Sequence, residues 1–175
     1  MLIIFGGLPG VGKTTLAKQL ARQLDAVYLR IDSIEQAMRD SAAVIGAIND
    51  AGYRAGYAIA EDNLRLGRTV IADSVNPLRS TRDAWLAVAN RAQVRAVEIE
   101  VRCSGIHEHR RRVETRDRDI PRLRLPTWEE TISRQYDTWD REHVVIETAD
   151  TTVEECVTHI RIMLKEDLGG LSCKG

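Results

Sequence analysis

The sequence contains few cysteines, few aromatic residues and no long hydrophobic run. Its three cysteines are widely spaced and form no CxxC pair, which argues against a disulfide framework and against a zinc site. The longest apolar stretches, such as residues 2–5, are far too short to cross a bilayer. No basic segment followed by an apolar core opens the chain, so we expect a cytoplasmic protein that does not bind membranes.

The charge balance argues against one broad class of proteins, the general nucleic-acid binders. Lys and Arg total 25 and Asp and Glu total 26, giving a net charge of −1, whereas general nucleic-acid binders are usually strongly basic. A hydrophobic content of 43% is typical of a globular chain, and 175 residues suffice for one domain with its own core. Among the basic residues, 21 are Arg and 4 are Lys, and guanidinium groups suit bidentate recognition of phosphate and carboxylate.

Strand-like and helix-like segments alternate along the chain. The expected strands are residues 2–5, 27–31, 69–73, 94–101 and 144–146. The expected helices are residues 13–24, 32–39, 51–66, 80–92 and 106–116, with two more opened by capping boxes at Thr127/Glu130 and Thr151/Glu154. This alternation predicts an α/β fold with a mostly parallel sheet. We expect a single domain over residues 1–167 and a disordered tail over residues 168–175.

A phosphate-binding motif lies between the first strand and the first helix. Residues 7–14, GLPGVGKT, match G-x-x-x-x-G-K-[ST] without a mismatch. Glycines allow backbone N–H groups to converge on phosphate oxygens, and the following helix directs its positive end at the same place. Lys13 is expected to reach the β- and γ-phosphates, and the Thr14 hydroxyl is a candidate Mg²⁺ ligand. The predicted ATP-binding residues are Gly7, Leu8, Pro9, Gly10, Val11, Gly12, Lys13, Thr14 and Thr15.

Two carboxylates follow the next two strands. Asp73 ends a hydrophobic strand in the manner of a Walker B residue and is a second candidate Mg²⁺ ligand. Asp32 is placed to accept a proton from an acceptor hydroxyl, as a general base does in phosphoryl transfer. Both carboxylates are expected at the carboxyl edge of the sheet, beside the phosphate loop. Each also has an ordinary alternative, since an Asp in these positions often caps a helix or stabilises a turn.

An arginine-rich segment follows the fourth strand. Residues 110–124 hold seven arginines against three acidic residues. Phosphoryl transfer spreads negative charge over the transferring oxygens, so a cationic lid over about residues 105–126 suits this chemistry. We expect Arg112 and Arg116, four residues apart, to share a helix face toward the nucleotide and to act in catalysis. A solvated charged helix is the alternative for any one of these arginines.

Four longer stretches carry a family resemblance. They are GLPGVGKTTLA, YLRIDSIEQAMRD, GYRAGYAIAEDNLRLGRTVIADSVNP and RLRLPTWEE. Together they resemble a family of small P-loop kinases that are often described only as AAA-family ATPases, and the resemblance covers roughly residues 1–165. More distantly, the chain is similar to chloramphenicol phosphotransferase, gluconate kinase, adenylylsulfate kinase and the kinase domain of polynucleotide kinase.

The resemblance implies both a fold and a set of roles. It implies a three-layer P-loop NTPase fold with strand order 2-3-1-4-5, ATP and Mg²⁺ on the phosphate loop, and a lid that supplies arginine. Lys13 and Thr14 would take the phosphate and metal roles, and Asp32 the acceptor-base role. Polynucleotide kinases carry an arginine three residues after that aspartate, whereas this chain has Glu35, which counts against a polynucleotide substrate.

Other polar and aromatic residues have less specific interpretations. Tyr53 and Tyr57 are expected on a half-buried helix face, and Asn76 either contacts the acceptor or builds a turn with the following proline. The four histidines show no metal-ligand spacing and are expected on the surface or in helices.

The sequence therefore predicts an ATP- and Mg²⁺-dependent phosphotransferase that acts on a hydroxyl of a small molecule. One alternative is a nucleotide or polynucleotide 5′-hydroxyl kinase, which the net charge and Glu35 disfavour. The other is an ATP-binding switch protein without an acceptor, in which Asp32 and the lid would have no evident task. We expect a monomer or a homodimer.

Overall fold

The computed structural model describes residues 1–41 and 46–169. All five strands are parallel and form one sheet in the order β2-β3-β1-β4-β5. The strands are β1 (Leu2–Gly6), β2 (Val27–Arg30), β3 (Val70–Asp73), β4 (Ala96–Arg102) and β5 (Val144–Glu147). The helices are α1 (Lys13–Leu24), α2 (Ile31–Asp40), α3 (Ala51–Arg65), α4 (Arg79–Arg91), α5 (Ile106–Thr115), α6 (Trp128–Ile132) and α7 (Val153–Gly169). The predicted α/β class and strand order are confirmed.

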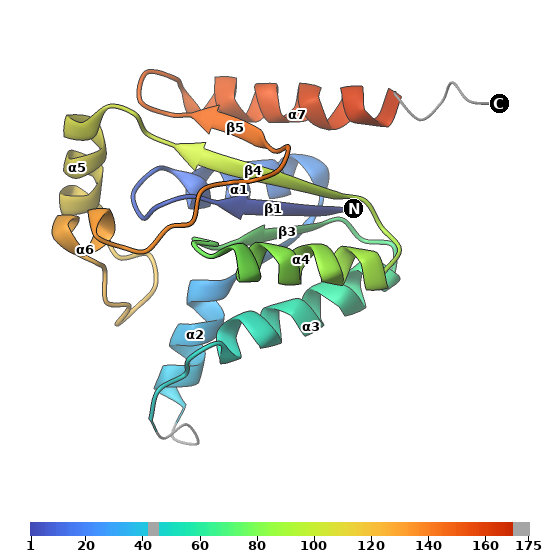
Figure 1. The fold of residues 1–175 in the computed structure, drawn as a ribbon, viewed down its shortest axis with the longest axis horizontal. Coiled ribbons are helices and arrows are strands. Elements are labelled where there is room, and N and C mark those ends of the chain that lie inside the picture. The colour runs from blue at the N-terminus through green and yellow to red at the C-terminus, as the bar shows by residue number, and fades with distance from the viewer. Residues whose placement is uncertain (42–45, 170–175) are drawn as a thin grey trace.

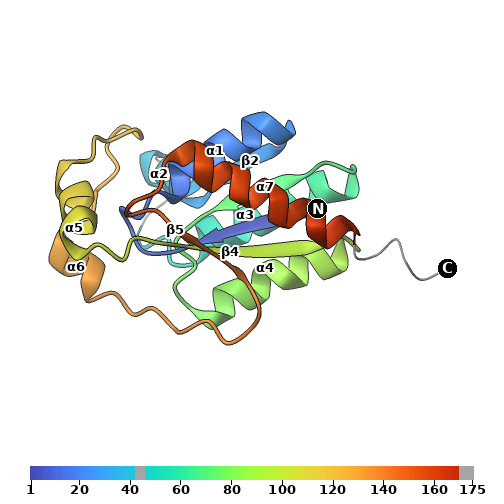
Figure 2. The ribbon, with the colours of Figure 1, turned by 90° about the horizontal axis from the view of Figure 1, so that it is seen from above.

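Helices cover both faces of the sheet, so the molecule has three layers (Figures 1 and 2). Alternate residues of a strand point to opposite faces, and each face of β1 therefore joins a different core. Ile3 and Phe5 pack with α1 and α7, while Leu2 and Ile4 pack with α3 and α4. All four side chains are fully buried, which explains why this strand reads as a continuous apolar run.

Several element boundaries differ from the sequence prediction by one or two residues. The capping box at Thr127 and Glu130 is present, but the last helix is capped one residue later than expected, by Thr152 and Glu155. Overlapping motifs at residues 151–154 and 152–155 made both positions possible. α5 ends at Thr115 rather than residue 116, and α7 continues to Gly169 rather than ending before residue 168. The rest of the predicted tail, residues 170–175, lies outside the described residues.

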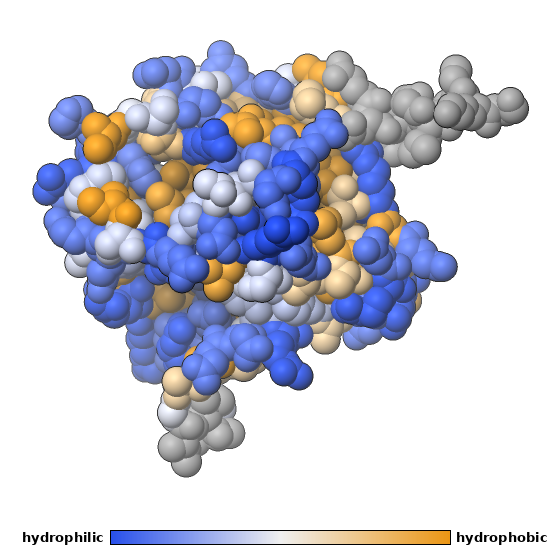
Figure 3. Space-filling view, in the orientation of Figure 1, coloured by the Kyte–Doolittle hydropathy of each residue, from blue (hydrophilic) through white to orange (hydrophobic). Residues whose placement is uncertain are grey.

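The carboxyl ends of all five strands meet at one edge of the sheet, where α5, α6 and the N-terminus of α1 also lie (Figure 1). The face drawn in Figure 3 is mostly hydrophilic, and its apolar residues form small separate groups. No helix within the described residues combines the length and the apolar character needed to cross a membrane.

Candidate active site

The phosphate loop, residues 7–14, connects β1 to α1 through three glycines with positive φ. Gly7 has φ of 134°, and a Cβ there would lie 2.3 Å from the Val101 carbonyl oxygen on β4. Gly10 has φ of 84°, and its Cβ would lie 2.5 Å from a methyl of Val113 on α5. A side chain at either position would strain the backbone and would also clash with the neighbouring atom on β4 or α5. The phosphate loop therefore packs closely against β4 on one side and α5 on the other.

The Lys13 side chain is buried in this loop. Its ammonium donates a 2.8 Å hydrogen bond to the Leu8 carbonyl, and no carboxylate among the described residues forms an ion pair with it. Burial lowers the pKa of Lys13 to about 8, while the more distant charges of Asp73 and Asp32 act in the opposite direction. An incoming polyphosphate would supply the negative charge that the ammonium lacks here.

α5 packs directly against the phosphate loop. The ring nitrogen Nε2 of His109 lies 2.8 Å from the Pro9 carbonyl oxygen, and the ring packs edge-on against Trp128 of α6. His109 is a buried residue of α5, so of the two positions expected for the histidines, surface or helix, it takes the second. The contact between His109 and Pro9 holds α5, where the arginine-rich segment begins, against the phosphate loop.

A cavity of about 920 Å³ opens beside the loop at the carboxyl edge of the sheet. Pro9, Gly10, Gly12, Lys13, Thr14 and Thr15 of the predicted ATP-binding set line it. Gly7, Leu8 and Val11 do not line it. Gly7 lies close to the Val101 carbonyl of β4, and Leu8 and Val11 pack in the core shared with α1 and α7. Of the described lining residues, eight are cationic and five are acidic, a positive excess in a chain of net charge −1. That excess suits a polyphosphate ligand.

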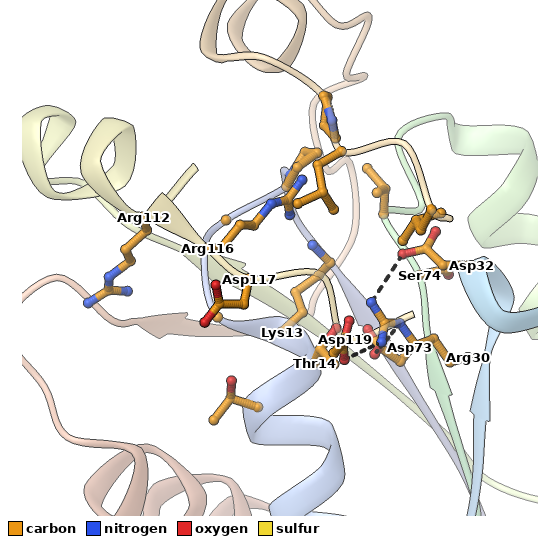
Figure 4. A pocket seen from close by; sticks show the side chains of 18 of the residues that line it. Lys13, Thr14, Arg30, Asp32, Asp73, Ser74, Arg112, Arg116, Asp117 and Asp119 are labelled. Carbon is orange, nitrogen blue, oxygen red and sulfur yellow. Dashed lines mark hydrogen bonds and ion pairs between the residues drawn. The ribbon is translucent and has the colours of Figure 1, made fainter. Parts of the chain in front are cut away.

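Both predicted carboxylates line this cavity (Figure 4). Asp73 is the last residue of β3, is 2% exposed, and accepts a 2.7 Å hydrogen bond from the Tyr28 hydroxyl. Asp32 lies in the first turn of α2 with 45% of its side chain exposed. Neither caps a helix, since α2 has Arg30 at its N-cap without a side-chain cap bond and Asp73 is still in a strand. The capping alternatives for these residues are therefore excluded.

The predicted pair of lid arginines is separated by the end of α5. Both arginines line the cavity, but Arg112 points away from Lys13, whereas Arg116 extends toward it (Figure 4). The guanidinium of Arg112 donates to the Thr148 hydroxyl at 2.9 Å, to the Thr148 carbonyl at 2.8 Å and to Glu108 at 2.7 Å. The expectation that both share one helix face was wrong, because the backbone at Arg116 is already extended, with ψ of 138°.

Arg116 is joined by a residue that the sequence analysis missed. Arg134, which follows α6, lines the same cavity, and its charge and that of Arg116 both help to lower the pKa of Lys13. No described carboxylate forms an ion pair with either arginine, and Nε of Arg116 is buried without a hydrogen-bond partner. Burial accordingly lowers the pKa of Arg116. Three cations without ion-pair partners thus converge on one part of the cavity.

Comparison with known proteins assigns the chain to a family. A family model for the AAA domain matches residues 2–138. The chain belongs to this AAA-domain family. No curated protein matches the sequence of this AAA-domain protein.

Solved structures share the fold of this AAA-domain protein at low identity. Adenylylsulfate (APS) kinase CysC of Mycobacterium tuberculosis, in complex with AMPPNP and APS, is 18% identical with a TM-score of 0.70, covering 94% of this chain and 96% of its own. A gluconokinase from Sinorhizobium meliloti is 16% identical with a TM-score of 0.64, covering 97% and 96%. Kti12 of Chaetomium thermophilum, in complex with ADP-AlF3, is 23% identical with a TM-score of 0.68, covering 93% and 98%. These similarities identify the P-loop NTPase fold.

The remaining predicted residues of the AAA-domain protein separate into lining and structural groups. Asn76 is fully buried, donates a 2.8 Å bond to the Phe5 carbonyl and accepts one from the Trp85 indole, so it does not contact an acceptor. Tyr53 and Tyr57 pack in the α3/α4 core and do not line the cavity. α2 contributes the lining residues nearest in sequence to Asp32, namely Glu35, Gln36 and Arg39.

The candidate Mg²⁺ ligands fit a hard cation that also binds phosphate. The Thr14 hydroxyl and the Asp73 carboxylate offer oxygen atoms to one cavity, which is the donor type that Mg²⁺ prefers. No group of three His, Cys, Asp or Glu side chains suited to a metal occurs within the described residues. A protein that binds Mg²⁺ mainly through nucleotide phosphates needs only one or two ligands of its own.

Proposed function

We propose that this protein is an ATP- and Mg²⁺-dependent phosphotransferase that moves the γ-phosphate of ATP to a hydroxyl of a small-molecule acceptor. The observation that carries this proposal is the meeting of the phosphate loop, Asp73 and Asp32 in one positively charged cavity. The names of two proteins that share the fold, an adenylylsulfate kinase and a gluconokinase, support the same reaction class.

The phosphate side of the cavity supplies binding and charge neutralisation. In the proposed reaction, backbone N–H groups of the phosphate loop and the Lys13 ammonium hold the β- and γ-phosphates. Arg116 and Arg134 stabilise the charge that spreads over the oxygens of the transferring phosphoryl group. Arg112 acts indirectly, by holding α5 to Thr148.

Thr14 and Asp73 are the residues that would hold Mg²⁺. When bound, the ion neutralises charge on the β- and γ-phosphate oxygens. The Tyr28 hydroxyl fixes the orientation of the Asp73 carboxylate through the 2.7 Å bond. Burial raises the pKa of Tyr28 further above its usual value, so the phenol stays protonated and continues to donate this bond at physiological pH.

The acceptor side lies between α2 and residues 116–126, which we name the lid segment. The acceptor oxygen attacks the γ-phosphorus, the bond to the β-phosphate oxygen breaks, and ADP leaves. Asp32 accepts the proton of the acceptor hydroxyl, a role that its exposed carboxylate at the cavity wall supports. Glu35, Gln36 and Arg39 from α2 would contact the rest of the acceptor. The lid segment would exclude water during transfer.

Transfer of labelled phosphate from ATP across a panel of hydroxyl compounds tests this function. The panel holds sugars, nucleosides, adenylylsulfate, aminocyclitols, chloramphenicol and short oligonucleotides, and the variants Lys13→Ala and Asp32→Asn serve as controls. We expect one acceptor class to be labelled and both variants to abolish labelling. Labelling of oligonucleotides alone would favour the 5′-hydroxyl kinase, with salt-dependent binding as a second sign.

The switch-protein alternative makes the opposite prediction for Asp32. A protein that only binds and slowly hydrolyses ATP needs no base for an acceptor hydroxyl. If Asp32→Asn left every nucleotide-dependent activity unchanged, the phosphotransferase proposal would be wrong.

A further inference from the structure

One carboxylate of the lid segment bridges two elements of the body. Asp119 Oδ2 lies 2.8 Å from Nζ of Lys18 on α1 and 2.6 Å from Nη1 of Arg30 at the end of β2. The hydrogen bond from Arg30 lowers the pKa of Asp119 to about 2, with Lys18 adding to the effect. The carboxylate is therefore charged at any physiological pH.

Arg30 is the least exposed member of this cluster. Only 10% of its side chain is exposed, against 39% for Lys18 and 44% for Asp119. Its guanidinium also lies 3.7 Å from Asp32 and 4.0 Å from Asp73 (Figure 4), and its buried Nε has no hydrogen-bond partner. Asp119 supplies the shortest of the three contacts. The lid segment thus reaches, through one guanidinium, the two carboxylates at the cavity wall.

Other polar contacts of the lid segment to the body are weaker. Arg122 lies 3.7 Å from Asp40 of α2, and both side chains are largely exposed, so this pair contributes little. Arg124 pairs with Glu130 of α6, the helix that directly follows the lid segment in the chain. This pair does not reach α1 or the sheet. Among the described polar contacts, those of Asp119 are the short ones that join the lid segment to α1 and β2.

We propose that Asp119 is a latch that holds the lid segment against α1 and β2, by ion pairs with Lys18 and Arg30. When the latch opens, Arg30 loses its shortest ion-pair contact and keeps only the longer ones to Asp32 and Asp73. The latch is a property of the free protein and does not depend on phosphotransfer. Any effect of the latch on Asp32 as an acceptor base rests on the proposed function.

Trypsin cleavage of the nucleotide-free protein tests the latch, because the lid segment contains its own cleavage sites. Arg122 and Arg124 are exposed and each is followed by leucine. We expect Asp119→Asn to accelerate cleavage after these two residues roughly five- to thirtyfold, as loss of an interaction of one or two kcal/mol would. Lys18→Met, which leaves the lid sequence unchanged, should give a smaller acceleration.

Two controls separate a latch from general loosening. Asp117→Asn removes a neighbouring carboxylate of the same loop for which the structure gives no ion pair or hydrogen bond, and it should leave the cleavage rate unchanged. Cleavage after Arg68, an exposed site in the turn before β3 and outside the lid segment, is the internal reference for general loosening and should not change in any variant.

The double variant gives the sharpest outcome. If Lys18 acts through Asp119, adding Lys18→Met to Asp119→Asn should produce no further acceleration. Equal cleavage rates for Asp119→Asn and Asp117→Asn, or a parallel rise at Arg68, would overturn the latch. Failure to find an acceptor would count against the proposed function and leave this result untouched, because the experiment contains neither ATP nor acceptor.

Discussion

Lys13 donates its one hydrogen bond in this structure to the carbonyl of Leu8, five residues earlier in the same loop. A buried ammonium that contacts a neutral carbonyl rather than a carboxylate is poorly stabilised as a cation. Burial disfavours the charged form and therefore lowers the pKa of Lys13 to about 8. The phosphate loop therefore holds a positive charge ready for phosphate, at the expense of the stability of the free protein.

The first prediction concerns the pH dependence of ATP binding. Above pH 8 the free protein loses the Lys13 proton, whereas bound phosphates favour the charged ammonium, so binding must take up a proton. ATP affinity should fall by up to about tenfold for each pH unit above 8. Calorimetry in buffers of different ionisation enthalpy at pH 9 measures both the affinity and the proton uptake. Lys13→Arg keeps its charge and should show neither effect; a pH-independent affinity in the natural protein would contradict the assignment.

The second prediction is that Lys13→Met stabilises the free protein. The pKa of Lys13 is lower in the folded than in the unfolded chain, so between about pH 8 and 10.5 the unfolded chain binds more protons and folding stability rises with pH. At pH 7 the full cost is present, and removing the charge should raise the free energy of unfolding by on the order of 1–3 kcal/mol. Urea denaturation at pH 7 and pH 10 measures this, and the gain should shrink at the higher pH. A gain that is equal at both values would point to packing rather than charge.

Local features of the site are readable from the sequence. The phosphate loop is predictable because its glycines, Lys13 and Thr14 lie in one short motif whose conformation is set locally. Asp32 and Asp73 are predictable because parallel strands bring their carboxyl ends to one edge, where the cavity lies.

Contacts between distant segments are not readable in this way. Asp119 lies 101 residues from Lys18 and 89 from Arg30, and no local pattern links them. The error over Arg112 and Arg116 has the same origin. Helical spacing predicts a shared face only while the helix continues, and α5 ends at Thr115, whose hydroxyl bonds back to the Arg111 carbonyl. The partner that decides the direction of Arg112, Thr148, is 36 residues away.

The third prediction is that replacing Arg116 or Arg134 lowers the turnover of ATP, whereas replacing Arg112 lowers thermal stability. Arg116→Ala and Arg134→Ala should lower the turnover of ATP on the order of a hundredfold or more, because both cations act near Lys13 and neither has an ion-pair partner among the described residues. Arg112→Ala should chiefly lower the melting temperature, because it removes the contacts to Thr148 and Glu108. ATP turnover and thermal denaturation of the three variants test this. A larger loss of turnover in Arg112→Ala than in Arg116→Ala would restore the sequence-based assignment.

The fourth prediction concerns Asn76, which joins β1, α3 and α4 beneath the site. Its side chain donates to the Phe5 carbonyl and accepts from the Trp85 indole, and its backbone N–H donates to the Tyr53 hydroxyl at 3.3 Å. Asn76→Ala leaves the buried indole N–H and the Phe5 carbonyl without these partners and places alanine at a φ of 47°, which asparagine tolerates better. We expect a loss of about 2–4 kcal/mol in the free energy of unfolding.

Asn76→Asp sharpens this test because it keeps the size and the backbone preference of the residue. An aspartate can still accept from the Trp85 indole, but its carboxylate would face the Phe5 carbonyl oxygen with no donor between them. Folding should then require the carboxyl to be protonated, so its pKa would be raised in the folded chain and stability would fall as pH rises from 4 to 7. Urea denaturation across this range, compared with the natural protein, measures the effect. A pH-independent stability difference would show that Asn76 acts through its shape and not through its amide donor.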